Sequence, residues 1–249
     1  MKYLSILFAL LVTSAVSAQT VETRLTILPG YQTAEGTRMA ALRLDLPPGW
    51  KTYWRAPGDA GIPPLITVEG APGARIHWPT PRAFDQNGMR SIGYAERLTL
   101  PVELPAGTTR LSGTMDIGIC HDVCVPVELP FAADLGAPGP PDPAILGALL
   151  DQPQPRGTAV CEVASDTDGL RLTATLQTPS TGAPEALVIE TADPAIWVSE
   201  PQIDRTGDRL VATARLKRGA DAFALDRSGL RFTLLGRDRA TEIIGCTGT

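Results

Sequence analysis

The sequence predicts an all-β protein made of two tandem β-sandwich domains, joined by a Pro-rich linker that contains one short helix. Of the 249 residues, 24 are Gly and 23 are Pro. This content of turn-forming residues, with few long helical patterns, is typical of strands joined by turns. Apolar and polar residues also alternate over several short segments bounded by Pro, Gly or Thr, as expected of half-buried strands.

The first 18 residues have the pattern of a secretory signal peptide. A short basic start precedes an apolar run over residues 4–12, and small residues at 16–18 form a cleavage site that ends at Ala18. The run is too short to span a bilayer. We therefore expect residues 1–18 to be removed and the mature protein to be periplasmic, without stable membrane insertion.

Residues 19–135 form the first predicted domain. Alternating segments lie at Met39–Leu46, Leu98–Leu104 and Leu111–Ile119. Three tryptophans of this domain, Trp50, Trp54 and Trp78, are expected to pack in or against its core, because large aromatic side chains dominate sandwich cores.

Residues 136–156 form the predicted linker, which is Pro-rich at both ends around a short apolar stretch, Ala144–Leu150, that fits two helical turns. Residues 157–249 form the second predicted sandwich. Its alternating segments lie at 170–176, 186–191, 209–216 and 230–236, separated by turn signals such as "TDG" and "RTGD".

Charge and motifs exclude several function classes. The chain has 22 basic and 27 acidic side chains and no basic stripe, which argues against binding to nucleic acid or to an anionic membrane surface. The sequence contains no G-x-S-x-G elbow. The two histidines of the chain lie in an aromatic segment and in a cysteine loop, so a hydrolase has little support.

Four cysteines in an exported chain permit two disulfides, which sequence alone can pair in three ways. Position favours Cys120 with Cys124 and Cys161 with Cys246. A Cys161–Cys246 bond would close a loop of about 85 residues and contribute on the order of 4 kcal/mol, so it is expected to be structural. The Cys120–Cys124 loop is too small for a comparable gain, which favours a labile or functional bond.

Specific motifs surround Cys120 and Cys124. The chain contains GW-x-x-YW-x-x-PGDAG-x-PP at 49–64, WP-x-P-x-x-F at 78–84, GY-x-x-x-x-x-LPV at 93–102 and C-x-x-x-C-x-P at 120–126. In this order they resemble the amino-terminal periplasmic domain of the thiol:disulfide interchange protein DsbD. The tight cysteine spacing is closer to the soluble amino-terminal region of ScsB-like proteins, which also have a second β-sandwich.

The resemblance implies an immunoglobulin-like sandwich that carries a redox-active cysteine pair, here Cys120 and Cys124. The implied activity is that of a thiol:disulfide oxidoreductase of the protein-disulfide reductase type, with no cofactor. Its implied partners are an integral membrane thiol reductase of the DsbD, ScsB or CcdA type and periplasmic thioredoxin-like proteins. By position, we expect Cys124 to be the sulfur that meets the partner.

Residues near the pair are candidates for tuning or covering it. His121 can stabilise a thiolate or relay a proton, whereas Asp122 would oppose thiolate formation. The resemblance also implies a loop with an aromatic residue that shields the pair, and the stretch 84–94 is the candidate cap. Within that stretch Phe84, Met89 and Tyr94 are the alternatives for the shielding residue.

Two alternative functions remain at this level. Cys120, His121 and Cys124, with Met89 or Met115 nearby, would form a soft ligand set suited to copper(I), and ScsB relatives are associated with copper tolerance. The third reading is a structural adaptor in which both disulfides are inert. A reduction potential separates these readings, because a working pair is far easier to reduce than a structural one.

Overall fold

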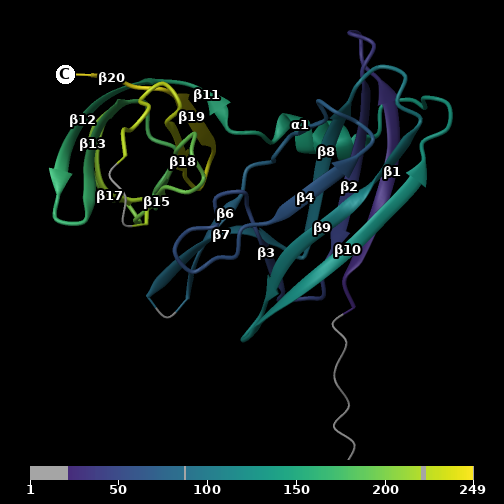
Figure 1. Cartoon of the computed structure of the whole chain (residues 1–249), viewed down its shortest axis with the longest axis horizontal. Helices are drawn as coiled ribbons and strands as arrows, with labels where there is room; N and C mark the ends of the chain where they lie inside the picture. Colours follow the sequence, from purple (N-terminus) through teal and green to yellow (C-terminus); the bar gives the residue numbers. More distant parts are fainter. Residues whose placement is uncertain (1–21, 87, 220–222, 249) are drawn as a thin grey trace, which may run out of the picture.

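The computed structural model describes residues 22–86, 88–219 and 223–248. The expected signal peptide, residues 1–18, lies outside the described residues. Strands make up most of the described chain, and they form four sheets in two separate groups (Figure 1). The predicted fold class, all-β with two tandem sandwiches, is confirmed.

The first domain packs one four-stranded sheet against one six-stranded sheet, the two-layer arrangement of an immunoglobulin-like sandwich. The four-stranded sheet has the order β1 (Arg24–Gln32), β2 (Arg38–Asp45), β8 (Arg97–Leu104), β5 (Arg75–Ile76). The six-stranded sheet has the order β10 (Cys124–Asp134), β9 (Arg110–Cys120), β3 (Lys51–Tyr53), β7 (Met89–Ala95), β6 (Arg82–Gln86), with β4 (Leu65–Glu69) also paired to β9.

The second domain repeats this two-sheet plan. One sheet has the order β11 (Gln154–Pro155), β19 (Ala240–Ile244), β18 (Arg231–Leu235), β14 (Ala186–Glu190). The other has the order β15 (Trp197–Val198), β17 (Arg209–Lys217), β13 (Gly169–Gln177), β12 (Thr158–Asp166), β20 (Thr247–Gly248), with β16 (Gln202–Thr206) also paired to β17. Every alternating segment named from the sequence coincides with a strand of one of the two domains to within one residue at each end.

Alternation along the strands places the two cores. In β9 and β17 every second side chain is buried, so each strand turns one face toward the opposite sheet. Trp54 is fully buried in the core of the first domain, and Trp50 and Trp78 are partly buried against it. The three tryptophans therefore pack as expected.

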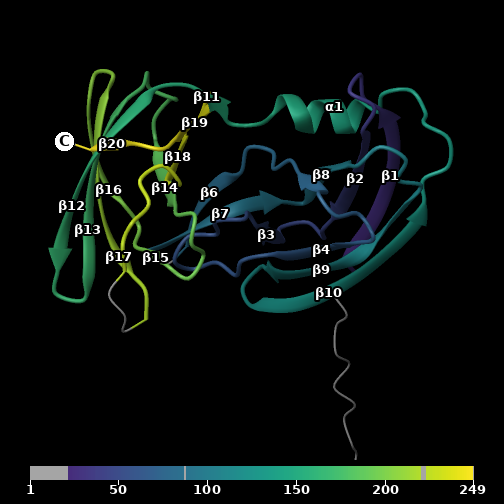
Figure 2. The same ribbon diagram turned by 45° about the horizontal axis from the view of Figure 1, so that its top comes forward.

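The linker is docked on the first domain. Helix α1 (Pro143–Leu150) begins after Asp142, whose carboxylate accepts a hydrogen bond from the Ala144 amide at 2.8 Å. Ile145 of α1 is buried against Met39 and Ala41 on the outer face of β2, and Figure 2 shows the helix lying across that sheet. Among the described residues, α1 and every other helical segment fall short of the length and apolarity that a membrane crossing needs.

The two domains contact each other through apolar side chains. Ala186, Val188 and Leu235, on the outer face of the second domain's β14–β18–β19 sheet, belong to one buried cluster with Trp54 and Ile92 of the first domain. The β6–β7 hairpin lies on the side of the first domain that faces the second (Figures 1 and 2). The second domain therefore packs against the first domain at the end of β3 and at β7.

Strand β10 is the edge strand of the six-stranded sheet and pairs with β9 along its whole length, from Cys124↔Cys120 to Asp134↔Arg110. Pro126 and Pro130 lie within it. The hairpin formed by β9 and β10 carries the cysteine pair at its turn.

Candidate redox site

Cys120 and Cys124 form a disulfide across the turn of the β9–β10 hairpin, with 4.1 Å between their Cα atoms. Cys120 ends β9 and is only 2% exposed, whereas Cys124 begins β10 and is exposed. The residues of the turn between them are exposed as well. A protein that approaches this end of the hairpin therefore meets Cys124 before Cys120.

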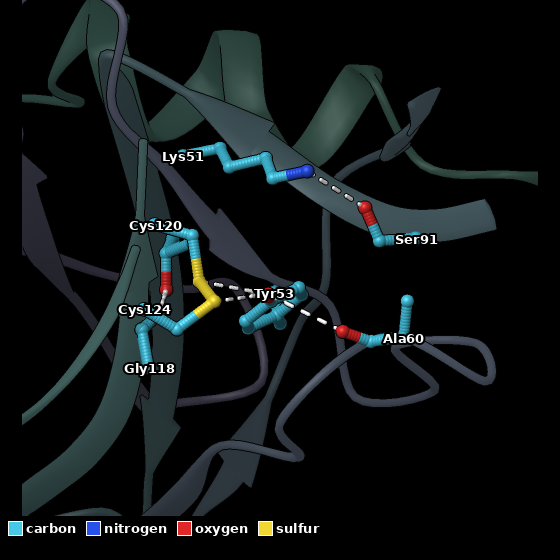
Figure 3. The surroundings of a disulfide bond; sticks show 8 residues. Lys51, Tyr53, Ala60, Ser91, Gly118, Cys120 and Cys124 are labelled. Carbon is cyan, nitrogen blue, oxygen red and sulfur yellow. Dashed lines mark hydrogen bonds between the residues drawn. A yellow bond between two sulfur atoms is a disulfide. The ribbon is translucent and has the colours of Figure 1, made fainter. Parts of the chain in front are cut away.

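The phenol of Tyr53 lies against both sulfurs. Its hydroxyl oxygen is 2.8 Å from Cys120 Sγ and 3.3 Å from Cys124 Sγ, and Figure 3 shows it pointing at the disulfide. Disulfide sulfur has no proton, so the hydroxyl donates and the sulfur accepts. Burial raises the pKa of Tyr53, which keeps the phenol protonated and able to donate at neutral pH.

Lys51 lies on the same face of β3 as Tyr53, two residues earlier, and pairs with Cys120 in the sheet register. Its ammonium group donates to Ser91 Oγ at 3.0 Å and lies 5.4 Å from the centre of the Phe84 ring. Burial lowers the pKa of Lys51. The ammonium group is thus directed toward Ser91 and Phe84, while the backbone of Lys51 lies beside that of Cys120.

His121 and Asp122 contact each other in the turn, with His121 Nδ1 2.9 Å from Asp122 Oδ2. The imidazole lies against Gly49, and its ring centre is 6.0 Å from that of Trp50. The contacts with Asp122, Gly49 and Trp50 thus fix the position of the imidazole in the turn.

Residues 55–62, here named the strap, run from the end of β3 back to the β9–β10 hairpin. The carbonyl of Ala60 accepts a 3.5 Å hydrogen bond from the Tyr53 hydroxyl. A Cβ atom on Gly118 of β9 would lie 2.8 Å from Ile62 Cδ1 and 3.1 Å from the Tyr53 ring. The strap can therefore lie close to β9 because residue 118 has no side chain.

The cap residues expected from the sequence lie in different surroundings. Tyr94 is buried in the core and donates to the Pro79 carbonyl at 2.8 Å, so it does not shield the disulfide. Met89 is 57% exposed at the tip of the β6–β7 hairpin. Phe84 lies against the Lys51 ammonium, and the side chain that contacts both sulfurs is Tyr53.

Sequence reasoning missed Tyr53 and Lys51 as site residues. The stretch "WKTYW" holds a signal for them, since residues two apart in a strand share one face. A strand of only three residues, however, gives no alternating pattern from which that face could be assigned.

The second disulfide joins Cys161 and Cys246, 85 residues apart in sequence and 5.8 Å apart at their Cα atoms. Cys161 is fully buried in β12, within the core of the second domain. Burial leaves the Cys161 sulfur inaccessible to an attacking thiolate, whereas Cys246 is partly buried.

The copper alternative is not favoured by the donor atoms. Both sulfurs of the site are bonded to each other, and Met115 is buried in the core of the first domain. Within the described ranges, no group of three or more His, Cys, Asp or Glu side chains is placed to hold a metal ion.

Comparisons with known proteins agree with this geometry. Residues 14–135 match the family described as "Thiol:disulfide interchange protein DsbD, N-terminal". The structure is similar to the crystal structure of the N-terminal periplasmic domain of ScsB from Proteus mirabilis, with a TM-score of 0.69 and 26% identity over 95% of this chain and 97% of that chain. A comparison with curated proteins finds no match. Through its first domain, the chain belongs to the family of the DsbD N-terminal domain.

Proposed function

We propose that the chain is a periplasmic thiol:disulfide exchange protein that relays electrons through Cys120 and Cys124. The observation that carries the proposal is the asymmetry of the pair, with Cys124 exposed and Cys120 buried against the Tyr53 hydroxyl. Family membership and the similarity to a periplasmic domain support it. The proposed donor is a membrane thiol reductase, and the proposed acceptors are periplasmic thioredoxin-like proteins.

Reduction of the pair proceeds by two exchanges. A thiolate of the donor attacks Cys124 Sγ, the bond between the two cysteines breaks, and Cys120 leaves as a thiolate. The donor's second thiolate then attacks the donor sulfur of the mixed disulfide and releases Cys124. Two electrons reach the pair, and the donor is left with a disulfide of its own.

Tyr53 assists the first exchange. Its hydroxyl already lies 2.8 Å from the sulfur that becomes the leaving group. Negative charge develops on Cys120 Sγ as the bond breaks, and a hydrogen bond to a charged acceptor is stronger than one to a neutral acceptor. The phenol therefore stabilises the transition state more than the starting disulfide.

Exposed apolar side chains lie next to the exposed sulfur. Val123 in the turn and Val125 on β10 flank Cys124 in the chain and are exposed, and Val123 is 72% exposed. Ile62 of the strap is also exposed, close to Gly118 of the hairpin. These side chains offer a partner a nonpolar contact around Cys124, as protein interfaces commonly do.

A redox titration of the mature protein in glutathione buffers tests the proposal, with alkylation and peptide mapping to follow each cysteine. We expect Cys120–Cys124 to titrate reversibly between about −270 and −120 mV, the range of known exchange proteins. Cys161–Cys246 is expected to stay oxidised, as structural disulfides do below about −300 mV. Equal resistance of both bonds would refute the proposal.

Substitution of Tyr53 by Phe removes the phenol proton and keeps the ring. We expect reduction of Cys120–Cys124 by dithiothreitol to slow by about tenfold to a hundredfold, because a hydrogen bond to a charged group contributes roughly 1.5–3 kcal/mol. Stopped-flow kinetics at constant pH measures the rate. Tyr31→Phe, in β1 against α1, is the matched control and should leave the rate unchanged.

A further inference from the structure

The strap connects the second domain to the redox site. We propose that Glu190 and Glu242 of the second domain are positioning residues for Cys120 and Cys124, which act by holding Arg55 at the start of the strap. The inference rests on the proposed exchange function and gives the second domain a role in it.

Arg55 is the main anchor. Its Nε and Nη2 atoms donate to both carboxylate oxygens of Glu190 at 2.8 and 2.9 Å, and Nη2 also donates to Glu242 Oε1 at 3.0 Å. All three side chains are mostly buried. Burial disfavours the charge on Arg55, but the hydrogen bonds and attraction to the two carboxylates outweigh it and raise the pKa of Arg55.

The guanidinium group of Arg55 is also fixed from the first domain. Its central carbon lies 4.2 Å from the centre of the Trp54 ring, a cation–π contact. Trp54 in turn is fully buried and directly follows Tyr53. Arg55, which forms the bidentate pair with Glu190 of the second domain, is thus only two residues after Tyr53, whose phenol contacts the sulfurs.

A second anchor lies further along the strap. Asp59 accepts a 3.3 Å hydrogen bond from the Glu200 amide of the second domain, and Glu200 forms a 2.8 Å ion pair with Arg90 of β7. The Pro57 carbonyl accepts a 2.8 Å hydrogen bond from the Ile92 amide of β7. The strap is thereby held between β7 and the second domain.

Close packing does not fix the strap on its outer side. A groove of 540 Å³ lies between the domains, lined by strap residues including Pro57 and Gly58 and by second-domain residues including Pro194 and Trp197. Ala56 and Ile62 pack on the inner side of the strap, and on the side of the groove its ion pairs and hydrogen bonds hold it to the second domain.

The end of the strap nearest the disulfide contacts Tyr53 and approaches Gly118. Ala60 competes with the two sulfurs for the single Tyr53 proton, and Ile62 lies over Gly118. Displacement of the strap would move the phenol away from Cys120 Sγ. Small displacements of a reacting group strongly reduce rates, so loss of the Arg55 anchor should slow exchange.

The experiment uses the full mature chain with Glu190→Gln and Glu242→Gln combined. These changes keep the side-chain shapes and remove the charges that hold Arg55. We expect reduction of Cys120–Cys124 by dithiothreitol to slow by about threefold to tenfold, with both disulfides formed and the circular dichroism unchanged. The dithiothreitol is oxidised to its cyclic disulfide as the pair is reduced to two thiols.

Glu185→Gln is the matched control. Glu185 forms a similarly buried ion pair with Arg205, but wholly within the second domain. Its loss should leave the exchange rate unchanged. Equal slowing by Glu185→Gln would show that general weakening of the second domain is responsible, and would overturn the proposal.

A double-mutant cycle with Tyr53→Phe separates positioning from stability. If the strap acts through the phenol, the effect of the two Glu→Gln changes should disappear in the Tyr53→Phe background. A full effect in that background, or an unchanged rate in the Glu→Gln variant, would overturn the proposal while leaving the exchange function intact. Failure of the proposed function would appear separately, as a Cys120–Cys124 bond that resists reduction in the unchanged protein.

Discussion

Substitution of Cys120 by Ser is expected to yield a protein that accumulates a stable mixed disulfide through Cys124. The exposed Cys124 thiolate can attack a disulfide of a thioredoxin-fold protein, and the missing Cys120 can no longer resolve the product. Incubation with the oxidised partner, followed by non-reducing electrophoresis and mass mapping, measures the trapped fraction.

The converse variant, Cys124→Ser, should be trapped far more slowly. Its remaining thiol, at Cys120, is 2% exposed, so a partner reaches it only after the hairpin or the strap opens locally. An opening free energy of about 3 kcal/mol would slow capture by about 100-fold. Equal capture of the two variants would contradict the assignment of Cys124 as the attacked sulfur.

Loss of the second disulfide is expected to destabilise the protein strongly. The double substitution Cys161→Ala and Cys246→Ala releases a constraint on residues 85 apart. The chain-entropy model assigns about 4 kcal/mol to such a loop. Guanidinium unfolding, with the first disulfide intact, measures the change in the free energy of unfolding.

The paired substitution Cys120→Ser and Cys124→Ser is the control for this prediction. Those residues are separated by four positions, and the same model gives only about 2 kcal/mol for so short a loop. Greater destabilisation by Cys120→Ser and Cys124→Ser than by the Cys161 and Cys246 substitutions would show that Cys120–Cys124 holds the first domain together. That result would favour the structural-adaptor reading.

The fold could be predicted where strands are long and covered on one face. β9, β13 and β17 show the alternation that one buried face imposes. Two-residue strands such as β5 and β11 have no period to detect. Their positions depend on neighbouring strands rather than on their own sequence.

The site could be predicted only as far as its covalent chemistry. The spacing of Cys120 and Cys124 and the motifs around them point to the pair, because the residue types themselves carry that chemistry. The sequence could not decide among Phe84, Met89 and Tyr94 as the shielding residue, because which face of a strand meets the core depends on register. Tyr94 pairs with Thr52 and faces inward with it, whereas Tyr53 faces the sulfurs.

The contacts between the domains could not be foreseen from the sequence. Arg55 and Glu190 are 135 positions apart, and no local pattern relates them. Charged side chains of this kind are normally exposed, so only the packing of one sandwich on the other reveals that they are buried together.

The two prolines of β10 determine how this protein can be recognised. Because they are four residues apart in a strand fully paired with β9, both ring nitrogens point to the outer edge, where a further strand would need N–H donors. That edge is therefore a poor template for β-augmentation or for edge-to-edge aggregation. A redox protein must be released after each electron transfer, and contacts made through side chains around Cys124 allow a brief encounter that an added strand would prolong.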